Sequence, residues 1–104
     1  MILEQAIFTI IPGQEKAFEA AYAEARSLIA ASPGFRKVEM HAGIEHPDRY
    51  LLLVWWDNVE AHMKGFRESE SYQQWRALLS PHYAAPPQMQ HFRDALQHNA
   101  FAKD

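Results

Sequence analysis

The fold of this chain is decided by the sequence YLLLVWW at residues 50–56, which is apolar at every position. Its aromatic residues and Val favour a strand, and the Pro and Asp within residues 45–48 supply a turn before it. A strand with one face in water alternates between apolar and polar side chains, whereas this one does not. We therefore expect a strand over residues 49–57 that is covered on both faces, with Trp55 and Trp56 on opposite sides of the sheet.

The segments before this strand predict two more strands and a helix. Residues 35–44 alternate in polarity and indicate a strand that pairs with 49–57 as an antiparallel hairpin. Residues 2–11 indicate a first strand that stops at Pro12, and residues 14–32 indicate a helix that ends at Pro33. The apolar stripe of that helix consists of Phe18, Ala21, Tyr22, Ala25, Leu28 and Ile29.

Two short helical segments and a last strand follow. Asp57 or Asn58 can cap the first helical segment, and Ser69 or Ser71 can cap the second, which runs to about residue 79. The expected inward faces consist of Val59, His62, Met63 and Phe66 in the first segment and of Tyr72, Trp75 and Leu79 in the second. Residues 81–87 form a loop, 89–92 a short fourth strand, and 93–104 a C-terminal extension.

The resulting order, β-α-β-β-α-β, is that of an α+β, ferredoxin-like fold: a four-stranded antiparallel sheet with its helices on one face. We expect one domain over residues 1–104, with its core in about 2–92. Helices of the same chain cover only one face, so the apolar strand needs a second cover. A second copy of the chain is the simplest cover and would give a homodimer; a tail or loop folded over the sheet is the alternative.

Composition excludes several classes of protein. The net charge is −3 and no basic block is present, so we expect no nucleic-acid partner. The chain has no Cys, which removes disulfides, Cys-ligated zinc and a Cys nucleophile and suits a cytoplasmic location. No signal peptide is visible and the longest apolar run is too short to cross a bilayer, so we expect no membrane partner.

Metal and nucleotide sites are also disfavoured. The six His residues lie at positions 41, 46, 62, 82, 91 and 98, and no pair has the i, i+4 spacing of a helical zinc site. A meeting of His41 and His91 on adjacent strands remains as a possible metal pair. The Gly-rich loops that bind nucleotide phosphates are missing from the sequence. We therefore expect neither metal nor flavin.

Several junctions between these segments resemble the antibiotic biosynthesis monooxygenase family. They are IIPGQ at residues 10–14, SPGF at 32–35, LVWWD at 53–57 followed by VEAH at 59–62, and FRES at 66–69 followed by YQQWR at 72–76. The likeness extends over about residues 2–92. It implies a dimeric α/β barrel, formed by the sheets of two protomers, with a pocket between each sheet and its own helices.

The resemblance also implies a range of activities. Some members oxygenate phenolic polyketide intermediates without metal or flavin, others act on quinols, and others degrade haem. The haem-degrading members use an Asn on the first strand and a Trp and a His on the second helical segment. Here the first strand has no Asn, Gly65 lies near the place of the Trp, and Trp75 or Arg76 lies near that of the His. Haem degradation is therefore disfavoured, and we expect no haem.

A cofactor-free oxygenase needs an apolar pocket, a group that takes the phenolic proton and a donor that stabilises the anion. His62 is the candidate base, because it lies on the inward face of its helix and its pKa could lie near neutrality; a buried His bonded to a backbone carbonyl is the alternative. His82 and Tyr83 are weaker catalytic candidates, in a loop that could close over the pocket, or else they are exposed loop residues.

The expected pocket is aromatic and contains a cation. Its candidate lining residues are Trp56, Phe66, Tyr72, Trp75 and Arg67, although the aromatic ones equally suit a core. Arg67, like Arg76, could anchor a carboxylate or phenolate, or pair with Glu68 or Glu70 at the surface. The expected function is that of a cofactor-independent monooxygenase acting on an aromatic, phenolic or quinol-type metabolite. The alternative is a non-catalytic dimeric module of the same fold that binds a small ligand or has a structural role.

Overall fold

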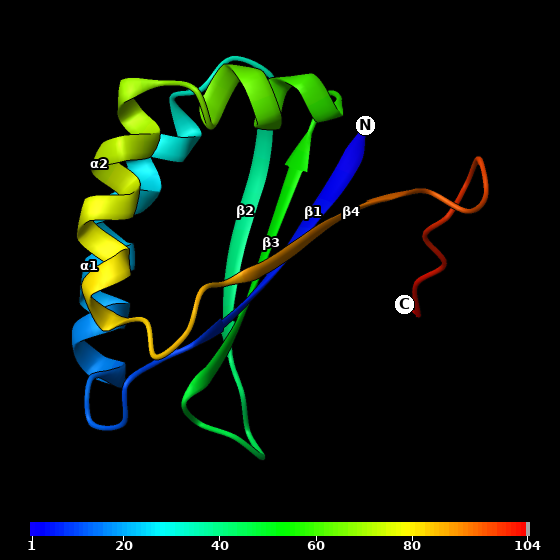
Figure 1. Cartoon of the computed structure of the whole chain (residues 1–104). Coiled ribbons are helices and arrows are strands. Elements are labelled where there is room, and N and C mark those ends of the chain that lie inside the picture. Colours follow the sequence, from blue (N-terminus) through cyan, green and yellow to red (C-terminus); the bar gives the residue numbers. More distant parts are fainter. Residues whose placement is uncertain (104) are drawn as a thin grey trace.

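The computed structural model describes residues 1–103 and consists of one antiparallel sheet with helices against one of its faces (Figure 1). The elements are β1 (Ile2–Thr9), α1 (Glu15–Ala30), β2 (Phe35–Ala42), β3 (Arg49–Trp56), the π-helix η1 (Ala61–Phe66), α2 (Glu70–Leu79), the 3₁₀ turn η2 (Ser80–His82) and β4 (Gln88–Arg93). The strands lie in the order β2-β3-β1-β4. The predicted β-α-β-β-α-β, ferredoxin-like fold is therefore confirmed.

The central strand β3 has two different faces. Tyr50, Leu52, Val54 and Trp56 point toward the helices, and each is at most 3% exposed. Leu51, Leu53 and Trp55 point to the opposite face and are half-buried. Because side chains alternate along a strand, Trp55 and Trp56 lie on opposite sides of the sheet, as predicted.

The core lies between the sheet and the helices α1 and α2. The buried helix residues are Phe18, Ala25 and Ile29 of α1 and Trp75 and Leu79 of α2. The ring of Phe18 lies 4.8 Å from that of Tyr50, between centroids, which fixes α1 against β3. Ser69, rather than Ser71, caps α2, because its hydroxyl accepts a hydrogen bond of 3.1 Å from the backbone N–H of Tyr72.

The segment after β3 departs from the prediction. Its residue spacing predicts an ordinary α-helix, but residues 61–66 form a π-helix, in which the Arg67 N–H donates to the His62 carbonyl 2.9 Å away. His62 and Phe66 are buried, whereas Val59 and Met63 are 41% and 36% exposed. The prediction that Val59 and Met63 face inward is therefore wrong: Met63 lies within the wider turn of the π-helix, and Val59 lies just before it.

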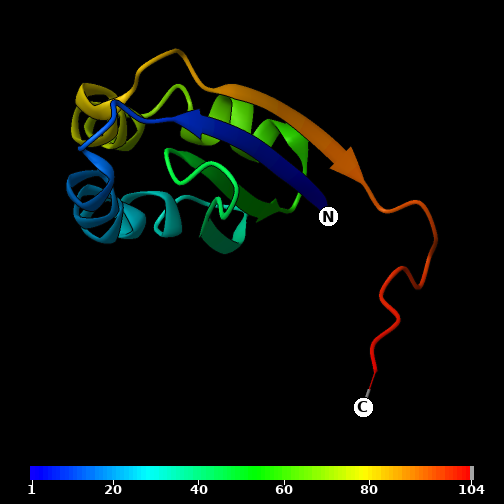
Figure 2. The same cartoon turned by 90° about the horizontal axis from the view of Figure 1, so that it is seen from below.

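The face of the sheet away from the helices is open. Its centre consists of Leu3, Ile7, Leu51, Leu53 and Trp55, which are paired across the strands, and the polar residues Gln5, Lys37, Glu39 and Gln90 lie among and beside them. The chain after β4 turns away from the sheet and does not fold over it (Figure 2). Leu96 and Phe101 in this extension are exposed. The C-terminal extension is therefore not the cover of this face.

The strand order also excludes the metal pair that His41 and His91 could have formed. These residues lie on β2 and β4, which are the two opposite edges of the sheet. Over the described residues, no three His, Cys, Asp or Glu side chains come together in a way that could hold a metal ion. No helix within residues 1–103 is long and apolar enough to cross a membrane.

Candidate active site

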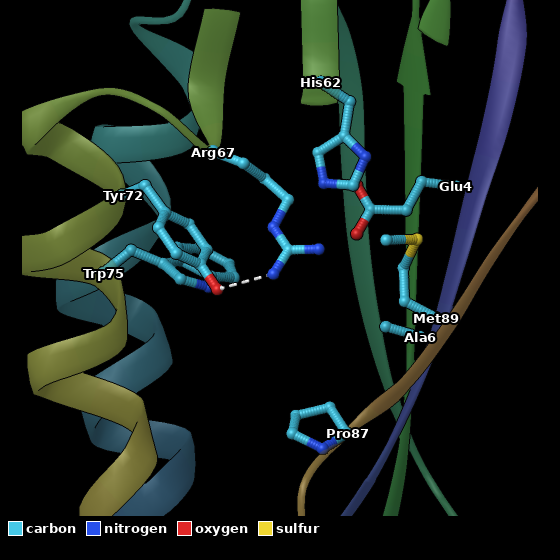
Figure 3. Close-up of a pocket in the computed structure, with 8 residues that line it drawn as sticks. All are labelled: Glu4, Ala6, His62, Arg67, Tyr72, Trp75, Pro87 and Met89. Atoms are coloured by element: carbon cyan, nitrogen blue, oxygen red, sulfur yellow. Dashed lines mark hydrogen bonds and ion pairs between the residues drawn. The ribbon is translucent and has the colours of Figure 1, made fainter. Parts of the chain in front are cut away.

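A cleft runs between the helix-side face of the sheet and the segment η1–α2. It has two adjoining cavities, which share the lining residues Arg67, Tyr72 and Pro87. The inner cavity, of about 120 Å³, is further lined by Glu4, Ala6, His62, Trp75 and Met89 (Figure 3). The outer cavity, of about 480 Å³, is further lined by Arg76, Ser80, Tyr83 and residues 84–86. Their combined size suits a small molecule.

The position of η1 over the cleft depends on Gly34 and Asn58. The Asn58 side chain accepts a 2.8 Å hydrogen bond from the backbone N–H of Ala61, at the start of η1. Gly34 has a positive φ of 86°, and a Cβ at this residue would lie 2.6 Å from the Cβ of Ala61. Glycine therefore permits both the backbone turn before β2 and the close packing of η1 on it.

Glu4 is a buried carboxyl group at the inner end of the cleft. It lies on the helix-side face of β1 and is 5% exposed. The indole N–H of Trp56 donates to its Oε1 at 3.0 Å, and Nε2 of His62 lies 3.3 Å from the same oxygen. Burial raises the pKa of Glu4 to about 7, although the Trp56 bond and the charge of Arg67 act in the opposite direction.

His62 connects Glu4 to a second imidazole. Its ring stacks on that of Trp56 at 5.3 Å, and its Nδ1 lies 2.8 Å from Nε2 of His91. Burial, followed by the charges of His91 and Arg67, lowers the pKa of His62 to about 3. This value contradicts the expectation that the pKa of His62 lies near neutrality. His62 is neutral at ordinary pH and is a poor base by itself.

Glu4, His62 and His91 form a continuous row of proton-exchanging groups. Glu4 and His91 are direct partners in the antiparallel pairing of β1 with β4, and η1 places His62 between them. Nε2 of His62 lies 3.3 Å from Oε1 of Glu4, and Nδ1 of His62 shares a hydrogen bond of 2.8 Å with Nε2 of His91, whose donor depends on the tautomers of the two rings. Since His91 is only half-buried, the row leads from a buried carboxyl toward solvent.

Arg67 brings a positive charge into both cavities. Its guanidinium extends between α2 and the sheet, where it donates to the Tyr72 hydroxyl at 3.4 Å (Figure 3). Its charge helps to lower the pKa values of both Glu4 and His62. The prediction that Arg67 pairs with Glu68 or Glu70 at the surface is wrong, because Arg67 forms no ion pair with either residue. The cation is therefore available to a negatively charged ligand.

The structure places the predicted site residues in three groups. His62, Arg67, Tyr72 and Trp75 line the inner cavity, and Tyr83 lines the outer one. Trp56 and Phe66 lie behind this lining: Trp56 binds Glu4, and the Phe66 ring lies edge-on to Tyr72 and Trp75. His82 lies elsewhere, with its Nδ1 2.9 Å from Oε1 of Gln14.

Three residues of this region, Glu4, Met89 and His91, were not predicted from the sequence as part of the site. A signal for Glu4 was present, because it is in phase with the buried residues Ala6, Phe8 and Ile10 along β1. A charged residue in an apolar stripe is unusual unless it has buried partners. His91 gave no comparable signal, because its role depends on the pairing of β4 with β1 rather than on its neighbours in the chain.

The sequence profile of the antibiotic biosynthesis monooxygenase family matches residues 1–78, which hold Glu4, His62 and Arg67. The chain belongs to this family. His91 and the outer-cavity residue Tyr83 lie beyond the matched segment.

Relatives of this antibiotic biosynthesis monooxygenase family protein extend over nearly all of its length. The Bacillus subtilis protein YczJ is 38% identical over 94 residues, which cover 90% of this chain and 99% of YczJ. A Bordetella bronchiseptica structure assigned to the same monooxygenases is 42% identical, with a TM-score of 0.88 over 91% of this chain and 97% of that one. SnoaB of Streptomyces nogalater, a cofactor-independent oxygenase, shares the fold, with 16% identity and a TM-score of 0.80 over 92% and 94% of the two chains.

Proposed function

We propose that this protein is a cofactor-independent monooxygenase that deprotonates a phenolic or quinol-type aromatic compound in the inner cavity. The observation that carries the proposal is the row Glu4–His62–His91, whose buried members Glu4 and His62 line a cavity together with aromatic side chains. A buried carboxylate is a stronger base than an exposed one, and the raised pKa of Glu4, about 7, suits general base catalysis at physiological pH.

The proposed reaction begins with transfer of the phenolic proton to Glu4. The resulting phenolate gives one electron to O₂, and the two radicals combine to form a peroxide at a ring C–H carbon ortho or para to the phenolic oxygen. The peroxide takes back the proton from Glu4 and becomes a hydroperoxide, which can lose water together with the hydrogen of that carbon. Loss of water then leaves a carbonyl group, so one oxygen atom enters the product and the other leaves as water. The substrate supplies all the electrons, which is why the chemistry requires no metal, flavin or haem.

The remaining residues of the cavity stabilise and orient the anion. The guanidinium of Arg67 lies between Tyr72 and the sheet side of the cavity, where it can donate to a phenolate oxygen (Figure 3). Tyr72, Trp75 and Met89 supply flat and apolar surface for an aromatic ring. Since an apolar cavity of roughly 150 Å³ accepts benzene, the inner cavity of about 120 Å³ suits a single ring.

The same proposal includes a homodimer formed through the open face of the sheet. Leu51, Leu53 and Trp55 of β3 point to this face, together with Leu3 and Ile7 of β1. A row of large apolar side chains across two central strands marks an interaction surface. Most soluble oligomers are symmetric pairs, so a second copy is the partner that the surface fits.

The activity is tested by oxygen consumption against a panel of phenols and hydroquinones. Removal of the base in Glu4→Gln should lower turnover roughly 10²–10⁴-fold, the usual worth of a positioned general base. The matched control is Glu24→Gln, which removes an exposed carboxylate on α1 far from the cleft. Tight binding of these compounds without oxygen uptake would favour a non-catalytic binding module instead.

A further inference from the structure

The outer cavity concentrates hydrogen-bond donors and contains no acidic side chain. Arg67 and Arg76 both line it, together with three residues that carry hydroxyl groups, Tyr72, Ser80 and Tyr83. Neither arginine forms an ion pair with any carboxylate that the structure describes. Burial raises the pKa of Tyr83, so its hydroxyl stays protonated and can donate.

The donors follow one line along α2. Tyr72, Arg76 and Ser80 are spaced four residues apart, so they lie on the same side of the helix and its end, along the cleft. Tyr83 stands at the far side of the line, where its ring packs 5.3 Å from that of Phe8 and its N–H donates to the Ser80 carbonyl. The donors are therefore attached to well-packed elements.

We propose that the outer cavity is a carboxylate subsite, so that the substrate is an aromatic acid whose ring enters the inner cavity while its carboxylate binds Arg76 and Arg67. This inference rests on the proposed function for the placement of the ring. A guanidinium binds a planar carboxylate through two parallel hydrogen bonds, which a hydroxyl or amide on the substrate cannot replace. The two cavities adjoin at their shared lining residues Arg67, Tyr72 and Pro87, so the proposal requires one molecule to reach past these side chains from the inner cavity to the outer one.

The competing explanation is that Arg76 only stabilises the last turn of α2, where a cation opposes the helix dipole. That role requires no ligand and gives no preference between ligands. A carboxylate subsite, in contrast, distinguishes an acid from its neutral amide of the same shape. The decisive measurement is therefore a comparison of two ligands rather than of two stabilities.

The test measures dissociation constants under anaerobic conditions, by quenching of tryptophan fluorescence. The probes are a hydroquinone with a propanoate side chain and the primary amide of the same compound. The acid should bind roughly 10–100-fold more tightly than the amide, the usual worth of a hydrogen bond to a charged group. Arg76→Gln should remove most of this preference and Arg76→Lys should restore part of it, while Arg26→Gln, an exposed arginine outside both cavities, should leave it unchanged.

Equal affinity for acid and amide in the wild-type protein would overturn the subsite, as would full retention of the preference in Arg76→Gln. Inorganic phosphate that competes as strongly as the acid would overturn the assignment to a carboxylate. The same samples separate this inference from the proposed function. Tighter binding of the acid than of the amide, without oxygen uptake, would refute the oxygenase and support the carboxylate subsite. Equal binding of both probes, with oxygen uptake, would support the oxygenase and refute the subsite.

Discussion

Glu4 is protonated and His62 is neutral between about pH 3 and pH 7, according to their pKa values. The pKa of Glu4 is raised to about 7 and that of His62 is lowered to about 3, so between these values the proton is on the carboxyl. The basic form of the pair therefore appears only as the pH rises past about 7. If Glu4 is the general base, kcat/KM should rise through this pH and then level off. A profile that is flat from pH 6 to pH 8 in the wild-type protein would contradict this role.

The same pKa shifts predict opposite effects on stability. Glu4 has a folded pKa above its ordinary 4.5, so its contribution is present below pH 4.5 and is lost as the pH rises to about 7. His62 has a folded pKa below its ordinary 6.5, so its contribution is present above pH 6.5 and is lost as the pH falls to about 3. The two slopes oppose each other between pH 4.5 and 6.5.

Replacing Glu4 should remove its pH-dependent contribution to stability and leave that of His62. The unfolding free energy of Glu4→Gln, relative to the wild-type protein, should rise by about 1 kcal/mol per pH unit between pH 4.5 and 7. Denaturant unfolding at several pH values measures the difference, and Glu24→Gln serves as the matched control. A constant difference across this range would mean that burial does not raise the pKa of Glu4.

At the scale of single residues, the sequence was informative where one helical or strand pattern decides the outcome. The inward position of His62 followed from its place four residues before Phe66, and both are buried. Its chemical state did not follow, because the lowered pKa depends on burial and on charges that other elements supply. A residue's direction is a local property, whereas its pKa depends on the assembled fold.

At the scale of elements, the main departure from the sequence pattern is η1. A period of 3.6 residues fits Val59 and Met63 as well as His62 and Phe66, and nothing in the pattern distinguishes an α-helix from a π-helix. Two of these four positions are exposed and two are buried: His62 lines the inner cavity, and Phe66 packs behind its lining. Such single π turns often occur at functional sites. Tertiary contacts, including the stacking of His62 on Trp56, accompany this local geometry.

The edge strand β4 contributes His91, which would connect the proposed base to solvent. His91→Gln keeps a polar group beside Nδ1 of His62 but cannot accept and release a proton. We expect kcat to fall roughly 10²-fold, at the lower end of the range for acid–base groups. Added imidazole in solution should restore part of the rate, which a purely structural role of His91 would not allow. His46→Gln, in the exposed turn between β2 and β3, is the control; a His91→Gln variant with wild-type kcat would exclude the relay.

At the scale of the whole molecule, the continuous apolar sequence of β3 was the most informative feature. It predicted that both faces of the strand need a cover, and in the structure the helices cover one face while the other remains open. The antiparallel sheet with helices on one face followed from the β-α-β-β-α-β order, since few topologies connect such elements without crossings, whereas the cross-strand register did not. The shape and lining of the cleft could not be predicted from the sequence. They depend on how β1, β4, η1 and α2 pack together in the folded chain.

The proposed dimer gives the last prediction. Leu53 lies at the centre of the open face, opposite Gln5 of β1 and Glu39 of β2. The wild-type protein should therefore scatter light as a particle of twice the chain mass of 12.0 kDa at micromolar concentration. Leu53→Glu should produce monomer or aggregate, because a charge buried without a partner costs several kcal/mol. Leu96→Glu, which adds the same charge to an exposed residue of the C-terminal extension, should leave the dimer intact. A wild-type mass of one chain would show that the open face does not pair with a second copy.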